Sequence, residues 1–468
     1  MDKFPEGFIF GTACASFQCE GAYNEDGKGE SIWDEFCRIP GKVKNSDDGK
    51  TACDSYHRAA EDVRLMKEMG IKVHRFSMSW PRIFPQGRGN INPLGFKYYD
   101  ELVDTLIENG IEPWITLYHW DLPLALQKEG GWLNKSTIDA FVDYAKAVAK
   151  HFDGRVKVYM PINEPECIAV LGYGTGEHAP GWQLEGVYVA QVMHNLCLAF
   201  SRASKAIREA SSEKVQIGTV TTGRLCFPRC PNPTAEEKCY LSSFDLSSEI
   251  TNAWGFTHSI YLDPLFFKKY DDSANEMLKE FAKTVPQGEW DEMVKPDFVG
   301  LNVYNGTMCD DEGRAMKLPT GFPRTAIGWP VTPEVMYYGT RHLYKRYGTP
   351  IIICENGVAC NDRLYEDGLV HDADRIDFLS RYLGELRRSI ASGTDIRGYL
   401  QWSVLDNFEW AEGYDPRFGL IYVDYETCER TPKDSARWYG KLIKENSEQH
   451  FKVINKIKSS LSSINLPL

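Results

Sequence analysis

The feature that most constrains the fold is a junction that recurs five times along the chain. At each junction a helical pattern ends on glycine, and a short apolar strand pattern follows within a residue or two. Glycine just past a helix adopts the left-handed capping conformation without the steric penalty that a Cβ atom would bring. The five capping glycines are Gly70, Gly110, Gly154, Gly348 and Gly393. Their repetition predicts helices and strands in regular alternation.

The helical segments before these glycines have one apolar face each. In two of them the apolar residues recur at helical spacing: Tyr99, Leu102, Val103, Leu106 and Ile107 in the first, and Ile376, Leu379, Leu383, Leu386 and Ile390 in the second. Three more apolar strand patterns, without a glycine cap, lie near residues 8, 215 and 297. The chain therefore has eight apolar strand patterns separated by helical segments.

Apolar strands that alternate with helices predict an α/β protein with a parallel sheet covered by helices. Eight such units favour a closed (β/α)8 TIM barrel over an open doubly wound sheet. The open sheet stays the alternative, but the chain has no phosphate loop of the G-x-G-x-x-G or G-x-x-x-x-G-K-[ST] type to favour it.

The positions of the long segments bear on the number of domains. A chain of 468 residues could hold two or three ordinary domains. The long segments, however, all follow strands rather than helices: 14–50, 223–258, 304–332 and 403–433. In (β/α)8 enzymes these strand-to-helix loops build the catalytic face. We therefore predict one domain over residues 1–468, with an elaborate catalytic face.

Charge and composition exclude several classes of partner. The net charge of −13 and the pI near 5.4 disfavour nucleic acid and anionic membrane surfaces. No apolar run approaches the roughly 18 residues that span a bilayer. The start, M-D-K-F-P-E-G-F, lacks the pattern of a secretory signal. The 13 scattered cysteines include no C-x-x-C, which is typical of free thiols in a reducing cytoplasm.

Metal sites have little support in the sequence. Cys226, Cys230 and Cys239 lie close together, but no histidine accompanies them and their C-x-x-x-C spacing is unusual for zinc. We therefore expect neither a metal nor a cofactor.

Polar and aromatic residues gather where the predicted strands end. The stretch P-I-I-I-C-E-N-G at 350–357 ends an apolar strand on Glu355, where desolvation penalises charge. A single such residue usually marks a strand that reaches the surface. The other strand ends, however, carry similar residues: Gln18, Arg75, His119, Trp120, Asn163, Glu164, Asn302, Tyr304, Trp402, Glu409 and Trp410. On a closed barrel all of these converge on one mouth.

Two of these residues, Glu164 and Glu355, would face each other across the barrel. Paired carboxylates that flank a bond are the apparatus of glycoside hydrolysis. Sugars also require hydrogen-bonding groups and flat aromatic faces, and the predicted mouth offers both. With no metal-ligand spacing, phosphate loop or Ser/His/Asp signature, other hydrolytic chemistries have less support.

Several long motifs occur in order along the chain: F-I-F-G-T-A-C-A-S-F-Q-C-E-G, R-F-S-M-S-W-P-R, L-Y-H-W-D-L-P, I-N-E-P, I-C-E-N-G, L-D-N-F-E-W and Y-D-P-R-F-G-L-I-Y-V-D. Through them the chain resembles the β-glucosidases of glycoside hydrolase family 1 over almost its whole length. The resemblance implies a retaining enzyme that removes terminal non-reducing β-D-glucosyl residues from β-glucosides or short oligosaccharides, as in cellulose degradation. It implies no cofactor.

The resemblance also implies roles for individual residues. Glu164 would be the general acid/base, and Glu355 the nucleophile. Arg75 and Tyr304 would hold Glu355 ionised by lowering its pKa, whereas the pKa of Glu164 would be raised. The expected substrate-binding residues are the polar Gln18, His119, Asn163, Asn302 and Glu409, the aromatic walls Trp402, Trp410 and Phe418, and the leaving-group platform Trp329.

Two departures from the family pattern bear on the leaving group. Glu166 stands where relatives often have tryptophan, and T-V-T-T-G at 219–223 stands where they often have asparagine. We expect Glu166 to line the leaving-group side and to favour a second sugar over bulky apolar groups.

Several alternatives stay open or weak. A 6-phospho-β-glucosidase would replace Glu409 and present cations to the phosphate, whereas A-E-G-Y-D-P-R at 411–417 is mostly acidic or neutral. A catalytically weak sugar-binding relative or a thioglucosidase would lack one of the two glutamates, and both are present here. Glucose, galactose and fucose cannot be distinguished by pattern, and the oligomeric state stays open.

Overall fold

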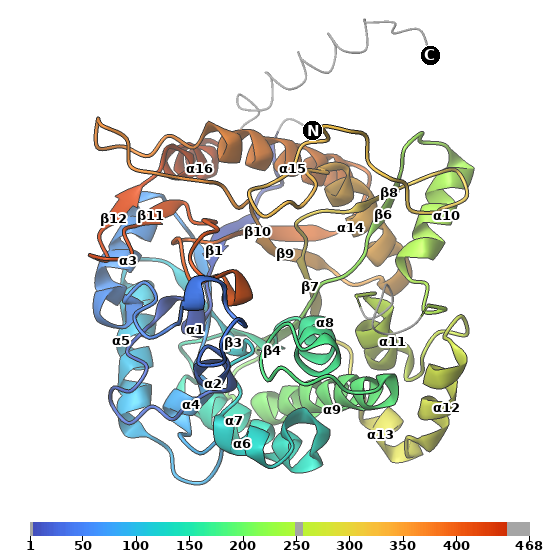
Figure 1. The fold of residues 1–468 in the computed structure, drawn as a ribbon, viewed down its shortest axis with the longest axis horizontal. Coiled ribbons are helices and arrows are strands. Elements are labelled where there is room, and N and C mark those ends of the chain that lie inside the picture. Colours follow the sequence, from blue (N-terminus) through green and yellow to red (C-terminus); the bar gives the residue numbers. More distant parts are fainter. Residues whose placement is uncertain (1–2, 249–255, 447–468) are drawn as a thin grey trace, which may run out of the picture.

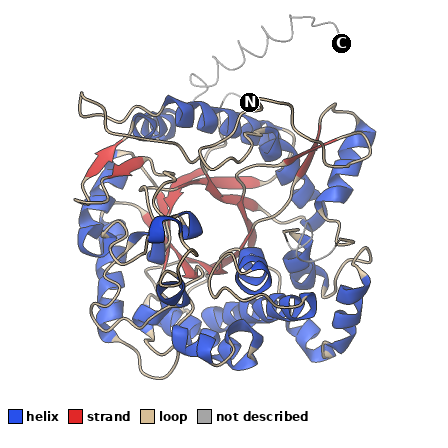
Figure 2. Cartoon of the chain, in the orientation of Figure 1, coloured by secondary structure: helices blue, strands red, loops and turns tan. Residues whose placement is uncertain are grey.

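Eight parallel strands close into a barrel in the computed structural model, which describes residues 3–248 and 256–446 (Figures 1 and 2). Around the ring their order is β1-β10-β9-β7-β5-β4-β3-β2. Their bounds are β1 (Ile9–Ala13), β2 (Val73–Ser77), β3 (Glu112–Tyr118), β4 (Val158–Ile162), β5 (Gln216–Thr221), β7 (Phe298–Asn302), β9 (Ile351–Asn356) and β10 (Ile396–Trp402). The predicted (β/α)8 barrel is confirmed.

Helices surround the ring of strands (Figure 2). The longer ones are α3 (Ser55–Glu68), α5 (Pro93–Glu108), α7 (Lys135–His151), α9 (Gly186–Ala210), α10 (Pro233–Ser243), α14 (Glu334–Tyr347), α15 (Ala373–Ala391) and α16 (Asp434–Glu445). The shorter ones are α1 (Ser16–Cys19), α2 (Ile32–Phe36), α4 (Trp80–Ile83), α6 (Leu124–Lys128), α8 (Pro165–Cys167), α11 (Ser259–Phe267), α12 (Glu276–Thr284) and α13 (Gln287–Glu292).

The glycine caps behave as predicted. Gly70, Gly110, Gly154, Gly348 and Gly393 all have positive φ, between 62° and 98°. The apolar stripes of α5 and α15 pack on the barrel as predicted, except for Ile107. Ile107 is 42% exposed, because it lies at the edge of the α5 stripe in the last helical turn.

A bulge in β9 explains how an apolar strand presents a carboxylate. Ile353 pairs with Leu301 of β7, and Glu355 pairs with the next residue, Asn302, so Cys354 is the extra residue on β9. Bulges re-aim side chains at sheet rims. Cys354 packs inside the barrel with its Sγ atom 3.9 Å from Met160 Sδ. The next residue, Glu355, is left at the mouth.

The long segments follow β1, β5, β7 and β10 as predicted, although residues 249–255 of the segment 223–258 lie outside the described residues. Two small sheets in these segments have no counterpart in the prediction. One pairs β6 (Cys226–Pro228) with β8 (Thr307–Cys309), and the other pairs β11 (Ile421–Val423) with β12 (Arg430–Pro432). The first sheet ties the loop after β5 to the loop after β7.

The cysteines are all free thiols. Cys226 and Cys239 are buried together with Cys309, whereas Cys230 is exposed. In residues 3–248 and 256–446, no group of three His, Cys, Asp or Glu side chains has a geometry that could hold a metal ion. Among the same residues no helix is long and apolar enough to cross a membrane.

Candidate active site

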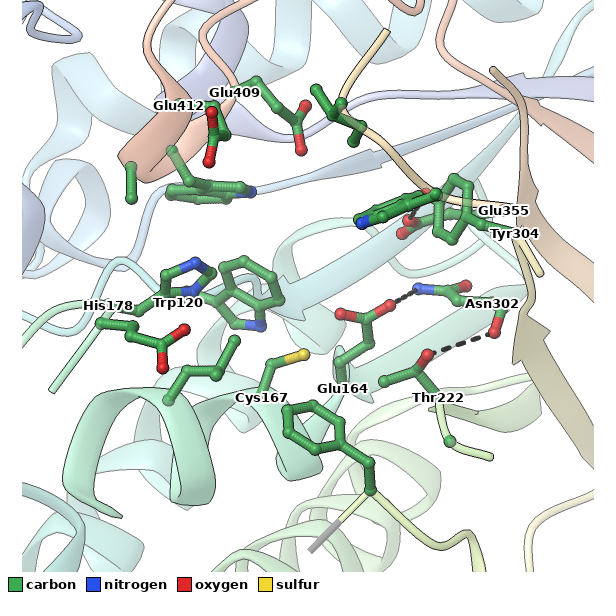
Figure 3. Close-up of a pocket in the computed structure, with 18 of the residues that line it drawn as sticks. Trp120, Glu164, Cys167, His178, Thr222, Asn302, Tyr304, Glu355, Glu409 and Glu412 are labelled. Atoms are coloured by element: carbon green, nitrogen blue, oxygen red, sulfur yellow. Dashed lines mark hydrogen bonds between the residues drawn. The ribbon is translucent and has the colours of Figure 1, made fainter. Parts of the chain in front are cut away.

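A cavity of about 1000 Å³ opens at the carboxyl ends of the barrel strands. Figure 3 shows part of its lining, with Glu164 and Glu355 facing the same space. The predicted residues that line the cavity are His119, Glu164, Asn302, Tyr304, Trp329, Glu355, Trp402, Glu409, Trp410 and Phe418. The other three, Gln18, Arg75 and Asn163, are fully buried and contact the lining residues from behind.

Glu355 is held by one cation and one phenol. Arg75 donates from Nη1 to Glu355 Oε1 at 2.7 Å, and the Tyr304 hydroxyl donates to Oε2 at 2.6 Å. Burial raises the pKa of Glu355 above its ordinary value, and Arg75 and Tyr304 oppose that rise. The expectation of a lowered pKa is therefore wrong, because desolvation at the barrel mouth outweighs the two partners.

No cation of residues 3–248 and 256–446 forms a hydrogen bond or ion pair with Glu164. Glu164 accepts a 2.7 Å hydrogen bond from the Asn302 side-chain amide, and the Cys167 thiol lies in hydrogen-bonding contact with it (Figure 3). Burial, followed by the negative charge of Glu355, raises the pKa of Glu164 to about 7. The predicted direction is confirmed, and the carboxyl can hold a proton near neutral pH.

A polar relay joins the two glutamates beneath the cavity. Arg75 Nη2 donates to Asn163 Oδ1 at 2.6 Å, and the Asn302 amide donates to the same oxygen at 3.2 Å. The Asn163 amide nitrogen lies 3.1 Å from His119 Nε2. Because these bonds cross from β2 to β4 and β7, they fix the direction of Glu164 relative to Glu355.

Three buried polar atoms of the predicted site residues have no protein partner within the described chain. They are Gln18 Oε1, His119 Nδ1 and Asn302 Oδ1. A buried polar atom without a partner costs about 1–3 kcal/mol. His119 and Asn302 line the cavity, and Gln18 lies directly behind Glu409, so these atoms are available to hydroxyl groups of a ligand.

Glu409 is the third carboxyl of the mouth. It accepts a 3.4 Å hydrogen bond from Gln18 Nε2. Burial, followed by the charges of Glu355 and Glu164, raises the pKa of Glu409 to about 8. The group can therefore act near neutral pH both as a donor and as an acceptor for sugar hydroxyls.

Aromatic rings form the walls of the cavity. The ring of Trp402 lies 5.8 Å from His119 and nearly parallel to it, and Trp410 lies 4.7 Å from Trp120. Trp329 is 37% exposed and lies further out, with its ring 5.3 Å from Tyr304. The inner wall is therefore enclosed, whereas Trp329 offers an open platform.

Three residues of the mouth have a strained backbone. Trp120, Glu164 and Trp410 have φ values of 76°, 46° and 53°, in the left-handed region that non-glycine residues avoid. Each such residue costs about 1–3 kcal/mol and persists where the surroundings hold it. Strain of this kind is typical of functional sites.

The expectation for Glu166 is wrong. Glu166 is fully buried and absent from the cavity lining. Its carboxyl accepts hydrogen bonds from the Thr221 hydroxyl and, at 3.4 Å, from the Thr222 main chain. The first turn of α8 faces the end of β5, so the residue two positions beyond Glu164 points away from the mouth.

The sequence prediction missed several lining residues. Cys167 lies one helical turn beyond Glu164, and that spacing could have placed it on the same face. Thr222, Arg224 and Glu412 also line the cavity. Thr222 and Arg224 come from irregular loop positions and Glu412 from a 3-10 helix of three residues, and no local pattern marks them.

The sequence is similar to those of known proteins over nearly the full chain. The family model of glycosyl hydrolase family 1 matches residues 1–448. Beta-glucosidase A of Thermotoga maritima is 40% identical over 456 residues, covering 95% of this chain and 99% of that protein. The 1,4-beta-D-glucan glucohydrolase of Thermotoga neapolitana is 40% identical over 453 residues, with the same two coverages.

A solved structure shares the fold in detail. The β-glucosidase of Thermotoga maritima in complex with deoxynojirimycin has a TM-score of 0.86 and 39% identity to this chain, covering 96% of this chain and 100% of that one. The family model and the sequence relatives agree on the family, and the solved structure agrees with the barrel fold. The chain therefore belongs to glycosyl hydrolase family 1.

Proposed function

We propose that this protein is a retaining β-glucosidase that releases terminal non-reducing β-D-glucosyl residues from β-glucosides or short β-linked oligosaccharides. One observation carries the proposal. Glu355 contacts Arg75 and Tyr304, whereas Glu164 faces the same cavity, contacts no cation among the described residues and has a pKa of about 7. Two carboxyls in such different surroundings can divide the roles of nucleophile and acid.

In the first step Glu355 attacks the anomeric carbon of the sugar. The proton on Glu164 passes to the glycosidic oxygen as the bond to the leaving group breaks. Arg75 and Tyr304 keep electron density on Glu355 until the new ester bond forms. The Asn302 amide directs Glu164 towards the departing oxygen, since it holds Glu164 Oε1 at 2.7 Å.

In the second step Glu164 acts as a base. Formation of the glycosyl ester removes the negative charge of Glu355, which is one cause of the raised pKa of Glu164. The carboxylate of Glu164 then takes a proton from water, which attacks the anomeric carbon and frees Glu355. Two inversions at one carbon give net retention.

The inner end of the cavity is the proposed glucose site. The atoms Gln18 Oε1 and His119 Nδ1, which have no partner within the described chain, and the carboxyl of Glu409 would bind hydroxyls there. Asn163 would act there together with His119, to which it is hydrogen-bonded. The rings of Trp402, Trp410 and Phe418 would cover the apolar faces of the sugar. Trp329 would carry the leaving group.

We also propose the wider setting. The whole chain, 1–468, would act as one domain in the cytoplasm, where its 13 free cysteines stay reduced. Short β-glucans from cellulose degradation would be natural substrates, because the Thermotoga neapolitana relative is named a 1,4-beta-D-glucan glucohydrolase. The charge of −13 argues against nucleic acid or a membrane surface as a partner.

A panel of substrates tests the proposal. We expect hydrolysis of nitrophenyl β-glucoside and cellobiose without added metal, with a bell-shaped pH profile whose basic limb lies near the pKa of about 7 of Glu164. Proton NMR should show that β-glucose is released first. Faster hydrolysis of the 6-phospho-β-glucoside, loss of activity in chelator, or release of α-glucose would contradict it.

A further inference from the structure

Glu166 is a fully buried carboxyl to which the proposed mechanism gives no role. It lies in the first turn of α8, two residues beyond Glu164. Its hydrogen bonds lead to the end of β5: the Thr221 hydroxyl donates to Oε1, and the Thr222 main-chain N–H donates to Oε2 at 3.4 Å. The side chain therefore ties α8 to β5.

The backbone of Glu164 is tied to the same strand end. Its N–H donates to the carbonyl of Val220 at 2.9 Å. Glu164 also has the strained φ of 46°, which requires support from its surroundings. The main-chain bond and the Glu166 side chain hold the first turn of α8 on consecutive residues of β5.

The tie continues into the cavity wall. Thr222 lines the cavity, and its hydroxyl donates to the Asn302 main-chain carbonyl at 3.3 Å (Figure 3). The Asn302 side chain in turn donates to Glu164. Glu166, Thr222, Asn302 and Glu164 thus form a closed ring of contacts around the acid/base carboxyl.

We propose that Glu166 is a positioning residue for Glu164. By clamping the first turn of α8 to β5, it sets the direction in which the Glu164 carboxyl enters the cavity. The inference rests on the proposed function, because it concerns the step in which Glu164 protonates the leaving oxygen. Glu166 itself is absent from the cavity lining.

The surroundings of Glu166 indicate that the clamp acts through hydrogen bonds rather than charge. The groups that face it are the Thr221 hydroxyl, with His258 Nδ1 3.0 Å beyond it, the buried Cys197 and Tyr261, and Glu164. None of these is a permanent cation. Burial raises the pKa of Glu166 to about 8 and lowers that of His258 to about 3, so both are neutral near pH 7.

The test compares two aryl glucosides of similar size. Dinitrophenolate departs from 2,4-dinitrophenyl β-glucoside without protonation. The leaving group of phenyl β-glucoside is poorer and needs a proton from the general acid. We expect Glu166→Ala to lower kcat/KM for the phenyl substrate about tenfold more than for the dinitrophenyl substrate, because small misplacements of a general acid are costly. Thr221→Val should also lower kcat/KM more for the phenyl substrate than for the dinitrophenyl substrate, but by a smaller factor. Glu166→Gln should restore most of the activity, since the amide oxygen can keep the bond from the Thr221 hydroxyl and loses only the long bond from the Thr222 N–H.

A control variant separates positioning from general destabilisation. Thr219 is fully buried two residues earlier on β5, on the same side of the strand as Thr221, and makes no hydrogen bond to Glu166. We expect Thr219→Val to change both substrates equally at matched thermal stability. Equal losses on both substrates for Glu166→Ala and Thr221→Val would overturn the proposal, as would a Glu166→Gln enzyme as impaired as Glu166→Ala.

Glu164→Ala in the same assay distinguishes this inference from the proposed function. If that variant shows the leaving-group split and Glu166→Ala does not, only the positioning role fails. If Glu164→Ala shows no split, the proposed role of Glu164 fails and the positioning role fails with it.

Discussion

Two groups of buried carboxylates each include a residue of the loop after β10, and they differ in how many cations contact them. The mouth group is Glu164, Glu355 and Glu409. In the described chain Arg75 is the one cation that hydrogen-bonds to any of them, through Glu355. The pKa values of Glu164 and Glu409 are accordingly raised, to about 7 and about 8.

The second group is an ionic network of Asp362, Asp372 and Asp406 with Arg375, Arg417 and Lys433. Lys433 donates to Asp406 at 2.6 Å and to Asp362 at 2.5 Å, and Arg375 donates to Asp362 at 2.6 Å. Burial alone would raise the pKa of Asp362. Arg375 and Lys433 outweigh burial and hold this pKa below its ordinary value.

The difference shows how one fold separates chemistry from support. In the network each carboxylate forms an ion pair with at least one cation, so these bonds can fix a loop. Asp406 and Glu409 are three residues apart, so the network anchors the loop that carries Glu409 into the mouth. At the mouth, Glu164 and Glu409 contact no cation among the described residues, and these two carboxyls can exchange protons near neutral pH.

The largest effect is expected from replacing Glu355, the carboxylate of the mouth group that contacts Arg75. Glu355→Ala should lower kcat by at least about 10⁴-fold on every substrate, because no other group replaces a lost nucleophile. Steady-state assays on dinitrophenyl and phenyl β-glucosides measure it. A variant that keeps its activity on the better leaving group would contradict the assignment.

Glu164→Ala should have a smaller and more selective effect. We expect kcat/KM to fall about 10²- to 10⁴-fold for phenyl β-glucoside and little for the dinitrophenyl substrate, which needs no proton. Azide should partly restore kcat and give a β-glucosyl azide, since a small anion needs no base. Uniform losses and no azide product would rule out the acid/base role.

The smallest expected effect is the dependence of stability on pH, which differs in sign between the two groups. The raised pKa of Glu409 contributes stability below its unfolded value, near 4.5, which is lost as pH rises to about 8. The lowered pKa of Asp362 contributes stability above its unfolded value, near 3.8, which is lost as pH falls.

Thermal unfolding from acid to alkaline pH measures this contrast. Glu409→Gln should flatten the fall of Tm on the alkaline side by a few degrees. Asp362→Asn should destabilise by roughly 3 kcal/mol near neutral pH, because it leaves buried cations short of a partner, and the loss should shrink in acid. If Tm changes with pH in the same way for both variants and the wild type, the two groups do not differ in their effect on stability.

Much of the fold and of the site could be predicted from sequence. The signals for helix ends are local, and a closed barrel places all strand ends at one mouth. Glycine caps such as Gly70 and Gly348 mark helix ends without any tertiary information. The barrel then brings all strand ends together, so His119, Glu355 and Glu409 had to meet once closure was assumed.

The errors concern properties that tertiary structure decides. The direction of Glu166 depends on which way the first turn of α8 faces, and a short helix offers no periodicity from which to read it. The raised pKa of Glu355 reflects burial, which competes with partners that sequence can suggest. The β6–β8 sheet joins residues about eighty positions apart through strands of three residues, too short for a pattern.

Trapping the covalent intermediate tests the central claim most directly, namely that the mouth carboxylate beside Arg75 and Tyr304 attacks the sugar. Incubation with 2,4-dinitrophenyl 2-deoxy-2-fluoro-β-glucoside, followed by peptide mass spectrometry, locates the ester. The account predicts a single fluoroglucosyl group on Glu355, in the peptide that contains I-C-E-N-G. A label on Glu164 or Glu409, or turnover without any covalent label, would contradict it.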